Sequence, residues 1–329
     1  MTEHSKITRD NAQPASLFER ADAMFGLGAI GPAAVPRNLP QPARKVTAPP
    51  PPRRAVGAEP LAAAQAPEPA APPAAAPEAT PEPQPVAFSG PFQTVPRDHL
   101  RVGGLIVPEA PVTALLEEFR IVKRELLADA RSTDDPLARR ILVCSPHSGE
   151  GKTYCATNLA IALAAERDIE VLLVDADVVR PSVCSRLGIE GGAGLMDALA
   201  DPAITPESLV ITTDIPGLFV LPAGTSNNLD AEYLASEHTG AVLDRLTRAA
   251  PRRVLVFDTP PALAASPAAE LAAHVGQAVL VVRADETSRA ALEDAQQLLS
   301  ACADIKLLLN AARYSPSGRR FGTYGEPRA

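Results

Sequence analysis

The residues best suited to chemistry lie in one stretch, from residue 141 to residue 177. There an apolar run leads into S-P-H-S-G-E-G-K-T (Ser145 to Thr153), and a second apolar run ends at Asp175 and Asp177. Glycines allow a chain to turn sharply and present backbone N–H groups to phosphate oxygens. A lysine and a hydroxyl that follow them can reach the outer phosphates and a magnesium ion. The stretch therefore predicts a binding site for a nucleoside triphosphate and Mg2+.

The glycine-rich loop departs at one position from the usual phosphate-binding pattern G-x-x-x-x-G-K-[ST]. Pro146 stands where that pattern has its first glycine. The predicted strand before the loop and the predicted helix after it still supply the structural context that such a loop requires. The residues predicted to bind nucleotide are Ser148, Gly149, Glu150, Gly151, Lys152, Thr153, Tyr154 and Asn310.

Three carboxylates follow predicted buried strands. Asp175 and Asp177 come after one apolar run, and Asp258 comes directly after another. Carboxylates in such places are costly unless they meet a cation, and oxygen ligands suit magnesium. The predicted metal site therefore consists of Thr153, Asp175, Asp177 and Asp258. A D-x-D turn on the surface is the alternative interpretation of the first two aspartates.

The elements that would position these residues alternate along the chain. Continuous apolar runs of strand length are separated by stretches of helical periodicity, which is typical of a mostly parallel sheet covered by helices on both faces. The predicted fold class is α/β, with a doubly wound and mostly parallel sheet. Strands are predicted at 140–144, 170–174, 209–212, 218–221, 253–257, 277–282 and 305–309, and helices at 112–129, 152–165, 195–199, 231–246 and 287–301.

The composition divides the 329 residues into an ordered part and segments that cannot fold alone. Of the 35 prolines, 19 lie between Pro32 and Pro96, in a stretch without apolar periodicity. Such a stretch cannot bury enough surface to offset the entropy of ordering it. The predicted parts are an N-terminal segment with a short amphipathic helix (1–31), a disordered Pro/Ala-rich linker (32–97), a nucleotide-binding domain (98–313) and a flexible tail (314–329).

Charge and hydropathy exclude some classes of function. The net charge of −8 argues against a general nucleic-acid binder, which would normally carry a basic surplus. Residues 1–10 lack the apolar segment of a signal peptide, and no run of about 18 apolar residues occurs, so a membrane role is expected only through a partner. The four cysteines form no C-x-x-C pair, which is typical of reduced core residues in a cytosolic protein.

Three motifs together, S-G-E-G-K-T, V-L-L-V-D-A-D-V-V-R-P and V-F-D-T-P-P, resemble those of the bacterial tyrosine kinases. These are P-loop NTPases of the MinD/ParA-like branch, found in exopolysaccharide and capsule loci. E-E-F-R-I-V-K-R-E-L-L (Glu117 to Leu127) resembles the E-x-x-R-x-x-R helix of that family, and V-L-V-V-R-A-D-E-T (Val279 to Thr287) also fits it. The likeness covers residues 98–313 and is greatest to the exosortase-linked exopolysaccharide autokinases.

The resemblance implies an ATP-dependent protein-tyrosine autokinase that regulates the chain length and export of an exopolysaccharide or capsule. It implies ATP and Mg2+ as cofactors, Lys152, Asp175 and Asp177 in catalysis, and Asn310 at the adenine edge. A membrane co-polymerase would be the partner. The protein would then be cytoplasmic and peripheral at the inner face of the cell membrane through that partner.

The resemblance also implies self-association and a phosphate acceptor. The predicted phosphoacceptors are Tyr314 and Tyr324 in the tail, which would enter the active site of a neighbouring subunit. In this family one helix mediates assembly into a ring-like homo-oligomer, and the residues that match it are Glu117, Arg120, Lys123 and Arg124.

Two departures from the family pattern keep other functions open. Val179 stands where the D-x-D-x-R motif of the family has arginine, and the tail carries only two of the four tyrosines of the chain. The sparse tail favours the alternative of a non-kinase, ATP-binding regulator of the same machinery. A ParA/MinD-like positioning ATPase is a third hypothesis. His147 argues against it, because that residue occupies the place of the signature lysine of those ATPases.

Overall fold

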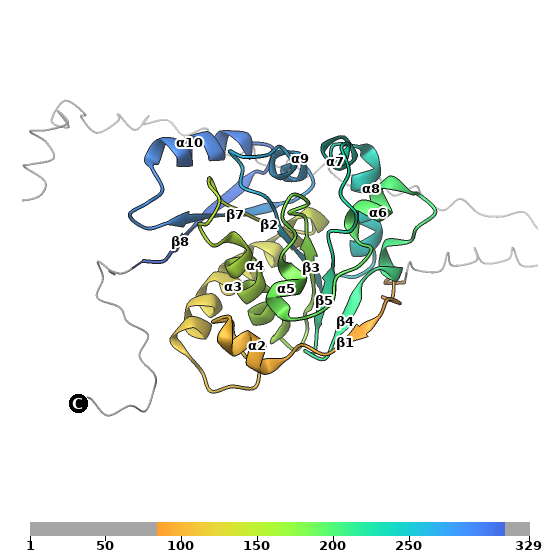
Figure 1. The fold of residues 1–329 in the computed structure, drawn as a ribbon, viewed down its shortest axis with the longest axis horizontal. Helices are drawn as coiled ribbons and strands as arrows, with labels where there is room; N and C mark the ends of the chain where they lie inside the picture. The colour runs from red at the N-terminus through yellow and green to blue at the C-terminus, as the bar shows by residue number, and fades with distance from the viewer. Residues whose placement is uncertain (1–83, 313–329) are drawn as a thin grey trace, which may run out of the picture. The chain divides into compact units, whose positions relative to one another are not determined.

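A computed structural model of the chain describes residues 84–312, which form an eight-stranded sheet with helices on both faces (Figure 1). The strand order is β1-β4-β5-β3-β6-β2-β7-β8, and all neighbouring strands are parallel except β4 and β5. The predicted fold class is therefore confirmed. The strands are β1 (Phe92–Gln93), β2 (Arg140–Cys144), β3 (Glu170–Asp175), β4 (Ile211–Thr213), β5 (Leu218–Leu221), β6 (Arg253–Asp258), β7 (Gln277–Arg283) and β8 (Asp304–Asn310).

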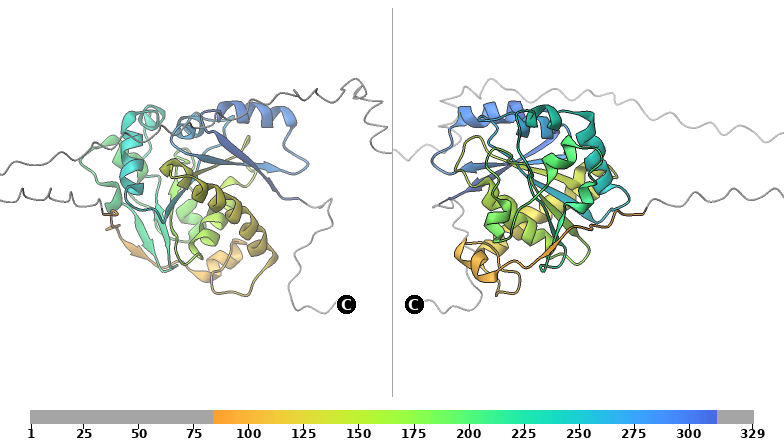
Figure 2. Two further views of the ribbon diagram at one scale, coloured as in Figure 1. Left: turned by 180° about the vertical axis from the view of Figure 1, so that it is seen from behind. Right: turned by 45° about the vertical axis from the view of Figure 1, so that its right-hand side comes forward.

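The helices fall into two groups that lie on opposite sides of the sheet (Figures 1 and 2). The first group is α2 (Arg97–Val102), α3 (Ala114–Ser132), α4 (Lys152–Ala164) and α5 (Val183–Leu187). The second group is α6 (Leu195–Ala200), α7 (Asp230–Leu234), α8 (Glu237–Thr247), α9 (Pro267–Ala272) and α10 (Arg289–Leu298). Short 3-10 turns lie at Pro136–Arg139 and Pro206–Ser208. None of the helices between residues 84 and 312 is long and apolar enough to cross a membrane.

The central strands are buried on both faces, as their continuous apolar sequences predict. In β2, Ile141 and Val143 pack into one core with α3 and α4, whereas Leu142 and Cys144 pack into a second core with α8 and α9. Successive side chains of a strand point to opposite faces, so one apolar run serves both cores. The sheet therefore holds the phosphate loop, which follows β2, on a rigid base.

One predicted helix is two separate helices in the structure. The helix predicted at 231–246 is interrupted at Ala235 and Ser236, which separate α7 from α8. Ser236 has extended backbone angles (φ −76°, ψ 154°), and its hydroxyl donates to the carbonyl oxygen of Tyr233. Serine is favoured just before the first turn of a helix and disfavoured inside one, because its hydroxyl competes for backbone hydrogen bonds. Because the apolar periodicity continues across Ala235 and Ser236, it predicts one continuous helix.

The linker predicted at 32–97 extends too far toward the nucleotide-binding domain. Within it, β1 pairs in parallel with β4 at the edge of the sheet. The ring of Phe88 packs on the ring of Phe219, and the guanidinium carbon of Arg253 lies 4.0 Å from the centre of the Phe88 ring. The apolar residues of this stretch are spaced between prolines, so the proline content alone predicts disorder. The N-terminal segment (1–31) with its predicted helix, residues 32–83 of the linker and the tail lie outside the described residues.

Candidate functional site

The loop between β2 and α4 has the backbone shape of a phosphate-binding loop. Gly149 (φ +86°) and Gly151 (φ +97°) adopt left-handed conformations, which glycine reaches without strain. A β-carbon at Gly151 would lie 2.2 Å from Nδ2 of Asn310, so a larger residue would displace that side chain as well as strain the backbone. The first N–H groups of α4 follow directly at Lys152, where the end of a helix favours an anion.

Helix α4 is buried on almost every side, and its polar side chains are satisfied internally. Thr157 donates its hydroxyl to the carbonyl oxygen of Thr153 at 2.7 Å. Asn158 accepts from the backbone N–H of Ile106 at 2.8 Å and donates to the carbonyl oxygen of Tyr154 at 3.1 Å. The bond with Ile106 also ties the helix that carries Lys152 and Thr153 to the segment between α2 and α3.

Two of the predicted acidic residues lie side by side at the carboxyl ends of neighbouring strands. Asp175 of β3 and Asp258 of β6 are paired in register. Asp175 accepts three backbone N–H groups, from Asp177, Ser182 and Val183, at 2.9 to 3.2 Å. Burial raises the pKa of Asp175 to about 6, although these donors favour its charged form.

Asp258 differs from its neighbour because its carboxylate oxygens have no hydrogen-bond partner. The residue is completely buried, and neither oxygen is paired within the described part of the chain. Burial raises the pKa of Asp258 to about 7, and the positive charge of Lys152 opposes this rise. A buried carboxylate without partners is strongly unfavourable. A cation, or water bound to one, would satisfy it.

The third aspartate is paired with the lysine of the loop. Nζ of Lys152 lies 2.6 Å from Oδ2 of Asp177. The other carboxylate oxygen of Asp177 accepts from the backbone N–H of Arg180 at 3.1 Å. The hydroxyl of Ser182 lies 3.4 Å from that of Thr153, which brings the turn after β3 against the first residues of α4. The structure thus brings the predicted lysine, hydroxyl and carboxylates together.

The donor set fits a magnesium ion carried by a nucleotide better than a metal held by protein alone. Among residues 84–312 no group of three or more His, Cys, Asp or Glu is arranged to hold a metal ion. Mg2+ characteristically keeps several waters and uses one or two carboxylates together with substrate phosphates. The unpartnered Asp258 and the nearby hydroxyl of Thr153 match that sparse requirement, whereas the oxygens of Asp175 already accept three N–H groups.

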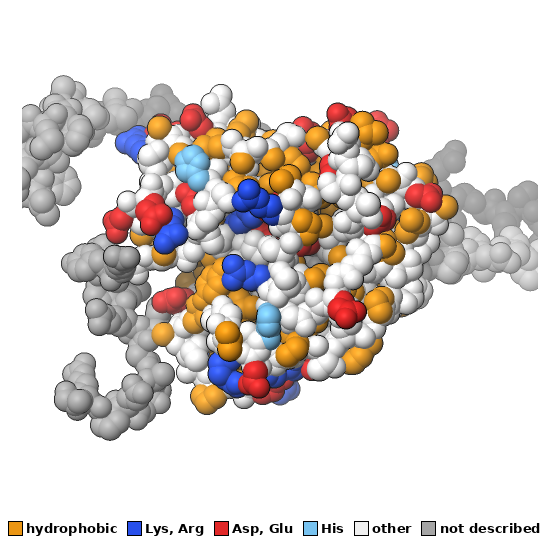
Figure 3. Space-filling model, viewed as in Figure 1, with side chains coloured by type: hydrophobic (Ala, Val, Ile, Leu, Met, Phe, Trp, Pro, Cys, Tyr) orange, Lys and Arg blue, Asp and Glu red, His pale blue; other side chains and the backbone are white. Residues whose placement is uncertain are grey.

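A pocket of about 450 Å3 opens beside the lysine and aspartate pair. Its walls are mostly apolar, and they include Lys152, Asp177, Val179, Pro260, Pro261 and Ala264. On the face of the molecule in Figure 3, Lys and Arg side chains are grouped near the middle, where Figure 1 shows α4 and α5. The pocket therefore offers space for an apolar or aromatic group next to the predicted phosphate site.

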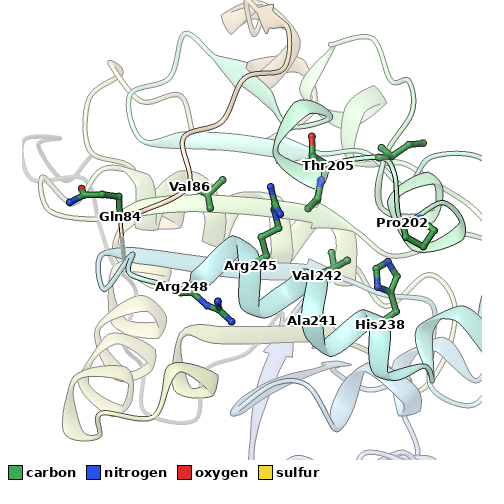
Figure 4. Close-up of a pocket in the computed structure, with 11 residues that line it drawn as sticks. Gln84, Val86, Pro202, Thr205, His238, Ala241, Val242, Arg245 and Arg248 are labelled. Carbon is green, nitrogen blue, oxygen red and sulfur yellow. The ribbon is translucent and has the colours of Figure 1, made fainter. Parts of the chain in front are cut away.

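A second pocket, of about 510 Å3, is not associated with the predicted chemistry. It lies along α8, whose side chains Val242 and Arg245 face the segment that carries Gln84 and Val86 (Figure 4). Arg245 is already paired with Glu207. None of the residues predicted from the motifs lines this pocket. We therefore place the candidate site at the phosphate loop.

Two other residues predicted to bind nucleotide, Tyr154 and Asn310, make hydrogen bonds within the protein. The hydroxyl of Tyr154 donates to the carbonyl oxygen of Gly104 at 2.9 Å, on the side of α4 that faces the α2–α3 connection. The amide of Asn310 donates to the carbonyl oxygen of Glu150 at 2.7 Å, so this side chain contacts the loop itself. Tyr314 and Tyr324 lie outside the described residues.

The residues predicted to mediate self-association divide into two kinds. Glu117 and Arg120 form an ion pair on the surface of α3, and Arg124 is exposed. Lys123 is buried, and its Nζ donates to the carbonyl oxygen of Ala162 in α4 at 2.8 Å. Its assignment to an interface stays a prediction, although within the single chain its charge is directed at the C-terminal end of α4.

Two residues at the site were not predicted. Arg283 donates to the carbonyl oxygen of Gly149 at 3.2 Å, and the hydroxyl of Thr287 is hydrogen-bonded to the carboxylate of Glu150. Both belong to the segment V-L-V-V-R-A-D-E-T, which the resemblance includes without giving it a role. The motif itself was recognised in the sequence. Its contact with a loop more than 130 residues away could not be predicted without knowing the fold.

Comparison with known proteins identifies the family of the chain. The CobQ/CobB/MinD/ParA nucleotide-binding domain matches residues 141–318, more than half of the chain. The tyrosine-protein kinase YwqD of Bacillus subtilis is 27% identical over 223 residues, which cover 67% of this chain and 91% of YwqD. EpsB of Ralstonia solanacearum, provisionally named a tyrosine-protein kinase, is 28% identical over 225 residues, which cover 66% of this chain and 28% of EpsB.

A solved structure shows the same fold. The kinase domain of the Escherichia coli tyrosine kinase ETK superimposes with a TM-score of 0.56 at 20% identity, over 72% of this chain and 87% of that domain. The chain thus spans most of YwqD but less than a third of EpsB. The chain belongs to the CobQ/CobB/MinD/ParA nucleotide-binding family, and the bacterial tyrosine kinases that the motifs predicted are its relatives there.

Proposed function

We propose that the chain is an ATP-dependent protein-tyrosine autokinase that regulates the chain length and export of an exopolysaccharide or capsule. The observation that carries this proposal is the pairing of Lys152 with Asp177 at the mouth of a largely apolar pocket, directly beside the phosphate loop. Such a pocket has room for a tyrosine ring as well as a phosphate. The names of the relatives support the same reaction.

The geometry indicates how the reaction would proceed. The loop N–H groups, the start of α4 and Lys152 bind and orient the outer phosphates. When a phosphate takes over the ammonium group of Lys152, the carboxylate of Asp177 is released. It can then accept the proton of a tyrosine hydroxyl in the adjoining pocket. Catalysis rests on this positioning and on charge stabilisation at the transferred phosphoryl group.

Magnesium belongs to this proposal. When bound, Mg2+ supplies neutralisation of the negative charge on the phosphate oxygens. Thr153 and Asp258 are the residues that would hold it, since neither oxygen of the buried Asp258 carboxylate has a hydrogen-bond partner among the described residues. Asp175 would contribute by fixing the turn that carries Asp177, through the three N–H groups that it accepts.

The acceptor and the partners follow from the same proposal. Tyr314 and Tyr324 would receive phosphate, each in the site of a neighbouring subunit of a ring-like homo-oligomer. Glu117, Arg120 and Arg124 on α3 are accessible for contacts in such a ring. A membrane co-polymerase would hold the protein at the inner face of the cell membrane.

Intact-mass spectrometry of the purified chain tests the kinase. With Mg-ATP, wild-type protein should gain the mass of one or two phosphates, and the gain should disappear in Tyr314→Phe/Tyr324→Phe. The double variant is a matched control because it leaves every described residue unchanged. Hydrolysis of ATP without any phosphotyrosine would reject the kinase assignment.

That last outcome would favour the second candidate, a non-kinase, ATP-binding regulator of the same machinery. The observation in its favour concerns acceptors. The chain has four tyrosines, and the hydroxyl of Tyr154 is already donated to Gly104 within the fold. Under this candidate the nucleotide state would control binding to the membrane partner, and no phosphate would be transferred to protein.

A further inference from the structure

Glu150 places a negative charge inside the phosphate loop. It lies between the two left-handed glycines of the phosphate loop, where a carboxylate would repel bound phosphates if it faced them. Its side chain is turned away instead, and only 5% of the residue is exposed. A buried charge of this kind persists only where hydrogen bonds satisfy it.

The partners of the Glu150 carboxylate come from two segments that are distant in sequence. Oε2 accepts the backbone N–H of His147 at 2.8 Å, which closes the loop on itself. Oε1 accepts the hydroxyl of Thr287, whose oxygen in turn accepts the backbone N–H of Arg283 at 2.8 Å. The carboxylate therefore fastens the phosphate loop to the connection between β7 and α10.

The carbonyl groups of the loop are held outward by the same part of the fold. Arg283 donates to the carbonyl oxygen of Gly149 at 3.2 Å, and Asn310 donates to that of Glu150 at 2.7 Å. In a trans peptide the N–H points opposite to the C=O of the preceding residue. Fixing these two carbonyls outward turns the N–H groups of Glu150 and Gly151 inward, where successive N–H groups form an anion-binding concavity.

We infer that Glu150 is a positioning residue that ties the phosphate loop to Thr287 and so holds its N–H groups toward the phosphate, without contacting nucleotide or metal itself. This inference rests on the proposed function, because it assumes that the loop binds ATP. Glu150 was itself predicted to bind nucleotide, and the inference gives it a role different from that of its neighbours Gly149, Gly151 and Lys152. Thr287 is the second positioning residue, because its hydroxyl binds the carboxylate of Glu150.

Conservative and disruptive variants distinguish positioning from direct binding. Glu150→Gln keeps an oxygen for the N–H of His147 and an amide that can donate to the oxygen of Thr287. Glu150→Ala removes both contacts. Thr287→Ser keeps the hydroxyl, and Thr287→Val removes it at similar volume. The affinity of the full chain for a non-hydrolysable ATP analogue with Mg2+ is measured by calorimetry, and hydrogen exchange of residues 145–153 is measured without nucleotide.

Positioning predicts that Thr287→Val binds the analogue about tenfold more weakly, as expected for the loss of one charge-assisted hydrogen bond, and that Glu150→Ala, which also loses the contact with His147, binds it at least as weakly. Both should show faster exchange of the loop amides. The affinities of Glu150→Gln and Thr287→Ser for the analogue should remain within about threefold of that of the wild type. The glutamine variant also has one negative charge fewer near the phosphates. A double variant, Glu150→Ala/Thr287→Val, should bind the analogue no more weakly than Glu150→Ala, because the link to Thr287 is already lost in that single variant.

Two results would overturn the inference. One is wild-type affinity and exchange in Glu150→Ala and Thr287→Val. The other is a glutamine variant as weak as the alanine variant, which would mean that the negative charge itself acts on the metal or nucleotide. If Glu150→Ala does not fold, the comparison of Thr287→Val with Thr287→Ser decides. If the wild-type chain binds no nucleotide, the proposed function fails, and loop exchange in the nucleotide-free protein still tests the link.

Discussion

Replacement of Lys123 tests two assignments against each other. The family resemblance predicts that Lys123 contacts a neighbouring subunit. In the structure its side chain is 7% exposed, and its Nζ lies 2.8 Å from the carbonyl oxygen of Ala162 and 2.7 Å from Oε1 of Glu166. The structure therefore predicts that Lys123→Met destabilises the fold of the single subunit.

The expected magnitude follows from the two contacts. The last four carbonyl groups of a helix have no partner within it, and Ala162 lies in the last turn of α4, which ends at Ala164. A hydrogen bond from a charged donor to such a group contributes about 1.5–3 kcal/mol. The ion pair with Glu166, whose side chain is 41% exposed, adds less than about 1 kcal/mol. Lys123→Met keeps the apolar stem, so the free energy of unfolding should fall by roughly 2–3 kcal/mol.

Urea unfolding followed by circular dichroism measures this free energy, and Arg124→Met is the matched control. Arg124 is the next residue of α3 but is exposed, so its replacement should change the free energy of unfolding by less than about 0.5 kcal/mol. Sedimentation velocity at a concentration where both variants are folded reports self-association. Unchanged stability of Lys123→Met together with lost self-association would refute the structural assignment and restore the interface.

The pH dependence gives an independent check on the same pair. Hydrogen bonding to Lys123 holds the pKa of Glu166 below its usual value of 4.5. A carboxyl group whose pKa is lowered by folding adds stability above its unfolded-state pKa and loses that contribution as the pH falls through its folded-state pKa. The difference between wild type and Lys123→Met should therefore become smaller as the pH falls below 4.5. A difference that grows in acid would contradict the ion pair.

Three further predictions concern the candidate site. Asp258→Asn should reduce Mg-ATP turnover by at least about a hundredfold without lowering the melting midpoint of the nucleotide-free protein, because neither oxygen of the buried carboxylate has a hydrogen-bond partner within residues 84–312. Retained turnover in a coupled ATPase assay would rule out its metal role. Ala264→Trp should fill the pocket beside Asp177 and reduce phosphotyrosine formation by about tenfold or more, while the affinity for an ATP analogue stays within about threefold. An equal loss of both would mean that the pocket holds nucleotide. ATP with Mg2+ should raise the melting midpoint, and a chelator should remove most of that rise, in a thermal-shift assay; a rise that survives chelation would show binding independent of metal.

The parts of the fold that were predicted correctly depend on short-range patterns. Buried strands at 140–144 and 218–221 have the predicted bounds, because a continuous apolar run that ends in a turn leaves little freedom in placing a strand. The phosphate loop was predicted for the same kind of reason. Glycine, lysine and hydroxyl occur at fixed spacing between a strand and a helix, and a single chain segment supplies them all.

The parts that were missed depend on contacts between distant segments. The burial of Lys123 is decided by the end of α4, about 40 residues away, and the sequence E-x-x-R-x-x-K shows only that it lies on α3. Likewise, β1 exists because β4 offers an edge to pair with, although its own sequence is rich in proline nearby. Local composition and periodicity carry no information on either partner.

The D-x-D motif shows how far spacing can predict chemistry and where it stops. Asp175 and Asp177 were both predicted to bind metal and to take part in catalysis, since nothing in the motif separates them. In the structure Asp175 accepts three backbone N–H groups and is directed into the turn, whereas Asp177 accepts one and is paired with Lys152 at the pocket. A carboxylate saturated by backbone donors is poorly placed to exchange a proton with a substrate. The carboxylate held by a lysine becomes free when phosphate binds that lysine. Asp175 and Asp177 are the same kind of residue and lie two positions apart, but the contacts of Asp175 suit it to a structural role and those of Asp177 suit it to proton transfer.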